Sequence, residues 1–423
     1  MQLKNVLESR LLKDFSSLFF SNIFEKFLGL IRELVIAFFL GSSILYANFL
    51  LLRIVADFFS QLTAGNALKA NLLPRFTKLY QKHESLSLKQ TFLFSQKTSV
   101  YLFIITQLLQ TVVIFCFNLE YDIRFFAVSI ILSLSISFNF INTLFLTVIQ
   151  AKGQFQRFSL ASIVNSSVFT SLAYPFIAFS SIVGLALSRF FGALVVTVAF
   201  VSPLKKESKG EDLVVGRSDF HFPTLILGNF VNIILISSRF IAGSDGTNSI
   251  TYFMYAVVVL NTLLTSVVGN ISTLTLRSFS IRRNTRMMIA SLAISIFLGV
   301  LMILSFNFFG RQIIDIIYVR GEFNAVDAIN TSQYLYRLSY SFLLLFIATA
   351  LFQPFLSLSV NKVKKERFYL ATILMITILV SSLFVLSKSS SPIYDTVIVM
   401  TLSSAVSVLL AIYSYYKYLM YEN

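Results

Sequence analysis

The stretch from Phe15 to Gly41 constrains this chain most: it is long and apolar enough to span a membrane, yet it carries Glu25, Lys26, Arg32 and Glu33. A charged residue near the centre of a bilayer costs roughly 2.5–3.5 kcal/mol on insertion scales, whereas each Leu, Ile, Phe or Val returns only about 0.3–0.6 kcal/mol. The four charges together cost on the order of 10 kcal/mol, which the apolar residues do not clearly offset. We therefore expect this helix to turn its charges toward a protein interior or a watery cavity, where charge indicates a functional site.

The rest of the chain has the composition of a membrane protein. Of its 423 residues, 56% are hydrophobic and only 13% are charged, which is unusual for a soluble domain. About twelve segments are long enough to span a bilayer, so the sequence predicts an all-α polytopic membrane protein. The segments are 15–41, 44–68, 95–117, 123–149, 157–179, 182–203, 222–243, 248–275, 287–309, 329–358, 367–387 and 394–416.

The sequence offers no pattern typical of an enzyme or a metal-binding protein. No group of His and Cys residues has the spacing of metal ligands, and no Gly-rich loop resembles a nucleotide-binding cradle. No set of nucleophile, base and orienting group can be assigned from the pattern, which disfavours catalysis. We expect no cofactor and no metal.

The basic residues predict the topology. When alternate connections are assigned to opposite sides of the membrane, 23 of the 34 Lys and Arg residues fall on one side and 4 on the other. By the positive-inside rule, both termini and the connection Lys205–Asp219 then face the cytoplasm of a bacterial plasma (inner) membrane. The net charge of +15 follows from this topology, with some attraction to anionic membrane lipids, and it does not indicate a nucleic-acid partner.

The connection Lys205–Asp219 is the longest polar one, and it separates six predicted spans from six. We therefore expect an N-terminal six-helix lobe over 1–204, a cytoplasmic connection over 205–219 and a C-terminal six-helix lobe over 220–423. Two bundles of equal size around a central cavity are typical of transporters that alternate access.

The candidate site lies on the first two spans. Residues 22, 25, 26, 29, 32 and 33 form one polar stripe of a helix, and Arg53 and Asp57 are spaced to pair along the second span. One interpretation is that these charges only neutralise each other and lock the bundle. The other is a hydrated site for an anionic ligand, in which the planar fork of Arg32 suits a diphosphate.

Two further features leave alternatives open. Arg189, in the sixth span, either lines a cavity or packs against another helix. The fourth span carries small polar residues that either form a polar face or hold helices together, as Ser and Thr often do in membranes. These residues are Ser133, Ser135, Ser137, Asn139, Asn142, Thr143 and Thr147.

Two motifs resemble those of a known family. The string Lys26–Glu33, followed by Ala37 and Gly41, is similar to the opening motif of the MurJ/MviN lipid II flippases. A second string, Tyr318–Asn324 with Asp327, resembles the R-G-x-F segment that precedes the tenth span of that family. The wider MOP superfamily also contains O-antigen and exopolysaccharide flippases and the MATE exporters.

The resemblance implies two six-helix lobes around a cationic cavity. It also implies transport of an undecaprenyl-diphosphate-linked glycan, with lipid II as the default, from the cytoplasmic to the outer leaflet for cell-wall synthesis. Of the four basic cavity positions of the family, two map to Lys26 and Arg32, whereas the others map to Ser60 and near Val258, which carry no charge. The twelve predicted spans also contrast with the fourteen of many MurJ proteins.

The substrate-binding residues expected from these observations are Lys26, Arg32, Glu33, Arg53, Asp57 and Arg189. Three alternatives to a lipid II flippase remain. One is a flippase for an O-antigen or exopolysaccharide repeat unit. The second is a MATE-like exporter, in which Asp57 or Glu33 would bind a coupling ion. The third is a membrane scaffold without transport, which has little reason to bear the cost of the charged stripes.

Overall fold

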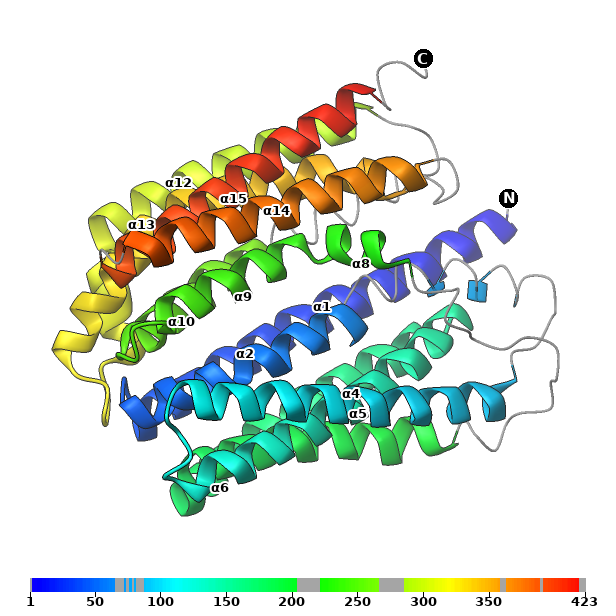
Figure 1. The fold of residues 1–423 in the computed structure, drawn as a ribbon. Coiled ribbons are helices and arrows are strands. Elements are labelled where there is room, and N and C mark those ends of the chain that lie inside the picture. The colour runs from blue at the N-terminus through cyan, green and yellow to red at the C-terminus, as the bar shows by residue number, and fades with distance from the viewer. Residues whose placement is uncertain are drawn as a thin grey trace. The chain divides into compact units, whose positions relative to one another are not determined.

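The computed structural model describes residues 2–64, 72–73, 76–77, 80, 87–203, 221–265, 285–357, 363–388 and 391–417. These ranges contain helices and no β-strand, apart from one isolated bridge between Arg320 and Phe323. Figure 1 shows long helices that run side by side within each part of the chain. The predicted all-α class is confirmed.

The helices coincide with the predicted spans where residues are described, and the ends of the predicted spans 44–68 and 248–275 lie outside the described residues. Those of the first part are α1 (Gln2–Leu40), α2 (Ile44–Ala64), α4 (Leu88–Cys116), α5 (Ile123–Ala151), α6 (Phe155–Val196) and the short π-helix η1 (Thr197–Val201). Those of the second part are α8 (Phe222–Gly228), α9 (Phe230–Gly243), α10 (Ser249–Leu263), α12 (Thr285–Tyr318), α13 (Ala325–Ser357), α14 (Lys364–Lys388) and α15 (Pro392–Tyr415).

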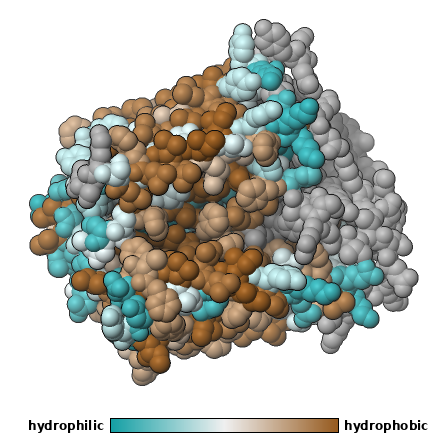
Figure 2. All heavy atoms as spheres, in the orientation of Figure 1, coloured by the Kyte–Doolittle hydropathy of each residue, from teal (hydrophilic) through white to brown (hydrophobic). Residues whose placement is uncertain are grey.

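Within the described ranges, eight helices are long and apolar enough to cross a membrane, and the bent pair α8–α9, with its 75° angle, would make a ninth. The predicted span 15–41 on α1 is not one of these eight, because four charges interrupt its apolar residues. Large apolar side chains on several helices are exposed, such as Phe179 at 89% and Phe308 at 71%. On the face drawn in Figure 2 such side chains predominate, so the chain is a multi-pass membrane protein.

The predicted spans 157–179 and 182–203 are two arms of α6, separated by a break at Ser181. Ser181 has φ 52° and ψ −124°, a conformation outside the helical region that L-residues rarely adopt. The arms lie very close together, because a Cβ added at Gly184 would come within 1.8 Å of the Phe176 carbonyl oxygen. Glycine is therefore required at this position of the second arm.

We expect Gly184→Ala to destabilise the protein by at least about 1–3 kcal/mol, because the backbone of one arm of α6 must move to admit the methyl group. The measurement is folded yield and thermal unfolding of the purified protein in detergent. Gly310→Ala is the matched control, since its Cβ would lie 3.8 Å from the nearest side chains. Equal stability of the two variants would contradict the tight hairpin.

The helices cluster into two units. The first comprises Met1–Phe39 and Val55–His221, and the second comprises Leu40–Ile54 and Phe222–Asn423. In the first unit α5 packs between α4 and α6. In the second unit α13 packs against α10, α12 and α15. The predicted connection 205–219 lies outside the described residues, and the assignment of the turn after α1 to the second unit was not expected from the sequence.

The turn after α1 is held within the second unit by the segment that precedes α13. Tyr255 donates a hydrogen bond to the Gly41 carbonyl oxygen at 2.8 Å, and Ser42 Oγ donates to Asp327 Oδ1 at 2.5 Å. Gly41 has φ 51°, and a Cβ there would lie 2.5 Å from the Glu322 carbonyl oxygen. The end of the first family-like motif thus contacts the second motif, although some 280 residues separate them in sequence.

The second motif itself forms the start of α13. The Asn324 side chain accepts the Asp327 backbone N–H at 3.1 Å, and the Asp327 side chain accepts the Asn324 N–H at 3.0 Å. This reciprocal pair is a capping box, which satisfies backbone donors at the first turn of a helix. Phe323 is 1% exposed and packs against Tyr255 and Tyr318. The motif therefore has a structural role in the second unit.

Candidate functional site

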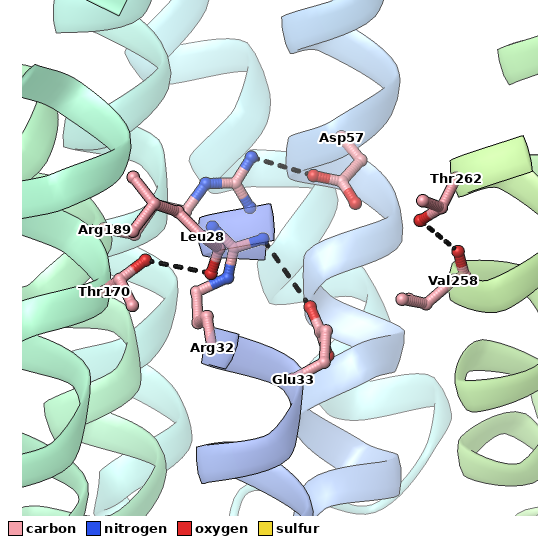
Figure 3. Close-up of polar contacts among 8 residues, drawn as sticks. All are labelled: Leu28, Arg32, Glu33, Asp57, Thr170, Arg189, Val258 and Thr262. Carbon is pink, nitrogen blue, oxygen red and sulfur yellow. Dashed lines mark hydrogen bonds and ion pairs between the residues drawn. The ribbon is translucent and has the colours of Figure 1, made fainter. Parts of the chain in front are cut away.

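Two ion pairs lie on α1, α2 and α6 inside the first unit. Arg189 Nη2 of α6 donates to Asp57 Oδ1 of α2 at 2.8 Å, and Arg32 Nη2 of α1 lies 3.6 Å from Glu33 Oε1. Figure 3 shows the two pairs one above the other. The exposed fractions of the side chains are 18% for Arg189, 13% for Asp57, 19% for Arg32 and 4% for Glu33. Pairing lowers the cost of keeping these charges within a membrane.

Arg32 is oriented by the first arm of α6. Its guanidinium carbon lies 4.2 Å from the centre of the Phe169 ring. On the next residue of that arm, the Thr170 hydroxyl donates to the Leu28 carbonyl oxygen at 3.2 Å, which ties α6 to α1 one turn before Arg32 (Figure 3). A guanidinium that stacks on an aromatic ring directs its N–H groups in its own plane, which is the arrangement that binds an oxyanion bidentately.

Two atoms of this cluster have unused hydrogen-bonding capacity. Glu33 Oε2 and Arg189 Nη1 are buried, and neither has a hydrogen-bond partner among the described residues. Buried polar atoms are normally paired with protein, water or ligand, because an unpaired one is costly. These atoms therefore mark positions where a further polar group would be stabilised.

Lys26 and Arg53 extend the charged region along their helices. Lys26 is half-buried and lies within electrostatic range of Glu25 and Arg32. Arg53 is half-buried on the part of α2 that clusters with the second unit, and its pairing with Asp57 stays a prediction.

The cluster in the first unit carries no excess positive charge. Its three bases and three acids sum to zero (3 − 3 = 0), and they are Lys26, Arg32, Arg189, Glu25, Glu33 and Asp57. An anionic ligand would therefore have to compete with a carboxylate for a guanidinium. Arg189 and Asp57 form the close, hydrogen-bonded pair that a locking role predicts, whereas the longer Arg32–Glu33 contact is easier to exchange.

The positions that depart from the family pattern are neutral in the structure as in the sequence. Ser60 is half-buried on α2, and Val258 lies on α10, which contains no charged residue. The Val258 carbonyl oxygen accepts a hydrogen bond from Thr262 at 2.7 Å (Figure 3). These positions supply no cation to a ligand.

Three of the seven polar residues predicted on the fourth span join helices together. Ser99 and Ser137 exchange hydrogen bonds at 3.0 and 2.9 Å between α4 and α5, and Ser133 donates to Gln110 at 2.9 Å. Asn142 donates to the Ala193 carbonyl oxygen at 2.8 Å. The helix-joining interpretation therefore holds for these residues.

Sequence reasoning did not identify Phe169 or Thr170, because neutral residues inside an apolar span carry no signal of a site. It did single out Arg189 and Asp57, although on separate grounds. Of the two alternatives for Arg189, contact with another helix is the one observed.

No protein-family model matches the chain, and no curated protein matches it either. Solved structures do match. The lipid II flippase MurJ in an inward closed conformation has a TM-score of 0.77 at 18% identity, over 95% of this chain and 87% of that one. An inward-facing multidrug resistance MATE family transporter of the MOP superfamily has a TM-score of 0.71 at 12% identity, over 92% and 93%. A MOP superfamily transporter from Pyrococcus furiosus has a TM-score of 0.67 at 12% identity, over 95% and 94%.

At such low identity, these likenesses establish the fold and not the substrate. They extend over nearly the whole chain, so the resemblance first suggested by two short motifs is confirmed at the level of the fold. The chain therefore has the fold of the lipid II flippase MurJ and of the MATE transporters of the MOP superfamily.

Proposed function

We propose that this protein is a flippase that moves an undecaprenyl-diphosphate-linked glycan, with lipid II as the default, from the cytoplasmic to the outer leaflet for cell-wall synthesis. The observation that carries the proposal is Arg32 on α1 of a MurJ-like fold, with its guanidinium held against the ring of Phe169. The test is whether this chain can replace a host's own lipid II flippase.

The charged cluster suggests how a diphosphate is bound and released. The ligand competes with Glu33 for the guanidinium of Arg32, because a diphosphate in bidentate contact provides a stronger partner than the single 3.6 Å contact to Glu33. Glu33, which is 96% buried as a side chain, then becomes a costly unpaired charge unless it takes up a coupling ion. Binding and release of the substrate are therefore linked to the state of one carboxylate.

An apolar groove beside the same helix supports a lipid substrate. It has a volume of about 740 Å³ and lies between α1 and the first arm of α6. Phe20, Phe24 and Phe27 line it from α1, at the spacing of one helix face. The four charged residues of α1 between Glu25 and Glu33 lie on other faces, so this part of the helix presents an apolar surface and a polar surface, as a lipid with an anionic head requires.

A second candidate function is a MATE-like ion-coupled exporter. The observation that favours it is the buried Glu33, whose Oε2 has no hydrogen-bond partner among the described residues and which would suit a cation. The paired guanidinium groups favour an anionic substrate and keep the flippase as the leading proposal.

The proposed direction of transport requires cytoplasmic termini. In a Cys116→Ser background, we expect an impermeant thiol reagent applied outside the cell to label Asp245→Cys and to leave Gln154→Cys unlabelled. Both positions are exposed turns between helices, so accessibility on the correct side is ensured. Gln154→Cys should react once the membrane is permeabilised, and its labelling in intact cells would reverse the topology.

A further inference from the structure

A small polar cavity lies inside the first unit, apart from the ion pairs. It has a volume of about 140 Å³, is partly open, and is lined by α5 and both arms of α6. Its lining is unusually polar for the interior of a membrane protein and contains no charged residue. The polar lining residues are Asn139, Asn142, Thr143, Ser162 and Asn165.

Only one of these five side chains is used to hold helices together. Asn142 donates to the Ala193 carbonyl oxygen and accepts from Thr197, both at 2.8 Å. The side chains of the other four make no hydrogen bond with a described residue, although helical Ser and Thr often bond to the preceding turn. Between them, two amides and two hydroxyls offer several donors and acceptors to whatever enters the cavity.

Gly192 keeps one of these amides in place. A Cβ at Gly192 would lie 2.8 Å from Asn165 Oδ1 and 3.0 Å from the Asn165 carbonyl oxygen, so glycine on the second arm leaves room for Asn165 in its observed position. The cavity is thus shaped by a close approach of the two arms of α6, the same feature that Gly184 makes possible.

The cavity is also close to the candidate anion site along α6. Asn165 lies four residues, or about 6 Å along the helix axis, before Phe169, and Phe169 contacts the guanidinium of Arg32. A ligand whose anionic group is bound by Arg32 could therefore place a directly attached neutral polar group at Asn165.

The lining selects for neutral hydroxyl and amide groups. Hard cations in proteins usually take at least one carboxylate ligand, and the cavity has none. The volume admits several water-sized groups, at about 30 Å³ each, and so suits the polar substituents of one sugar residue. Amide and hydroxyl side chains also discriminate strongly in favour of ligands that pair with them.

We propose that this cavity is a sugar subsite, which binds the hydroxyl and acetamido groups of the first sugar next to the diphosphate. The inference rests on the proposed function, because it takes the diphosphate of a lipid-linked glycan to be held at Arg32. It adds a binding site on α5 and α6 that recognises the first sugar of the glycan.

The test measures binding of two probes to the full-length protein in nanodiscs: farnesyl diphosphate, and the same lipid carrying N-acetylglucosamine. We expect the wild type to bind the sugar-bearing probe at least about tenfold more tightly, since several hydrogen bonds are added. Asn165→Leu should remove most of this difference in affinity. Thr143→Val should weaken binding of the sugar-bearing probe about three- to tenfold. Neither substitution should change binding of farnesyl diphosphate.

Thr147→Val is the matched control, because Thr147 lies one turn from Thr143 on α5, outside the cavity lining, and bonds the Thr143 carbonyl oxygen at 2.7 Å. Equal affinity of the wild type for the two probes would overturn the proposed sugar subsite. A loss of affinity for both probes alike in the two variants would also overturn it. If Asn165→Leu does not fold, the affinity of Thr143→Val for the two probes tests the sugar subsite by itself. Failure of the wild type to bind either probe, or normal binding of both by Arg32→Ala, would instead contradict the proposed function.

Discussion

Replacing Arg32 by alanine should lower transport at least about a hundredfold and leave the amount of protein in the membrane near normal. A charge-assisted hydrogen bond contributes about 1.5–3 kcal/mol, so loss of a bidentate contact to a diphosphate removes about 3 kcal/mol or more. The loss to folding is smaller, because the Arg32–Glu33 contact is long at 3.6 Å and the buried Glu33 carboxylate left behind takes up the proposed coupling ion.

The measurement is flipping of a labelled polyprenyl-diphosphate glycan in proteoliposomes, together with membrane abundance in cells. Arg32→Lys should keep part of the activity, because it preserves the charge but loses the planar fork. Glu33→Gln should bind the substrate at least as tightly as the wild type, since it removes the carboxylate that competes for Arg32.

Arg189→Ala is the structural counterpart in the same cluster. Breaking a buried ion pair by removing one partner costs about 3–5 kcal/mol, and somewhat less here because the Arg189 and Asp57 side chains are 18% and 13% exposed. This variant should therefore lose abundance as well as activity. Full transport by Arg32→Ala would show that the site hypothesis is wrong, and loss of that protein from the membrane would favour a purely locking role.

The spans were predictable because hydropathy and length determine them directly in a membrane. The charges of α1 were equally visible, since any charge in a span stands out against its neighbours. The break of α6 at Ser181 was also close to the predicted gap between 179 and 182, but its tightness was not foreseen. That tightness depends on the contact of Gly184 with the Phe176 carbonyl oxygen, which a linear pattern does not encode.

The partners of the charges were harder to foresee than their positions. The pairing of Arg189 with Asp57 joins residues 132 apart, and no helical spacing indicates it. Phe169 is one of 46 phenylalanines, so the sequence could not distinguish it, as a residue that contacts Arg32, from phenylalanines that face lipid. The second motif was recognised as a pattern, but its capping box and its contact with Ser42 emerge only from the fold.

The second large effect concerns the substrate. We expect this chain to restore growth when a host's own lipid II flippase is depleted, and to flip polyprenyl-diphosphate saccharides that lack a peptide at a similar rate. Ser60 and Val258 provide no charge where the family pattern has a base, and the cluster around Arg32 balances its own charges. An acidic peptide on the headgroup therefore finds few cations, so recognition rests on the diphosphate and the adjacent sugar.

Two measurements distinguish a lipid II flippase from a repeat-unit flippase. The first is growth, with lipid II detected at the outer leaflet, after the host's own lipid II flippase is depleted. The second is surface polysaccharide in a strain that lacks its repeat-unit flippase. The Arg32→Ala variant is the control in both strains. Because both substrates contain the diphosphate that Arg32 is proposed to bind, this variant should restore neither growth nor surface polysaccharide. Rescue of growth alone, with no transport of peptide-free saccharides, would mean that this chain recognises the peptide by groups other than the missing bases. Restored polysaccharide without growth, at normal membrane abundance, would contradict lipid II as the default substrate and identify the repeat unit as the cargo.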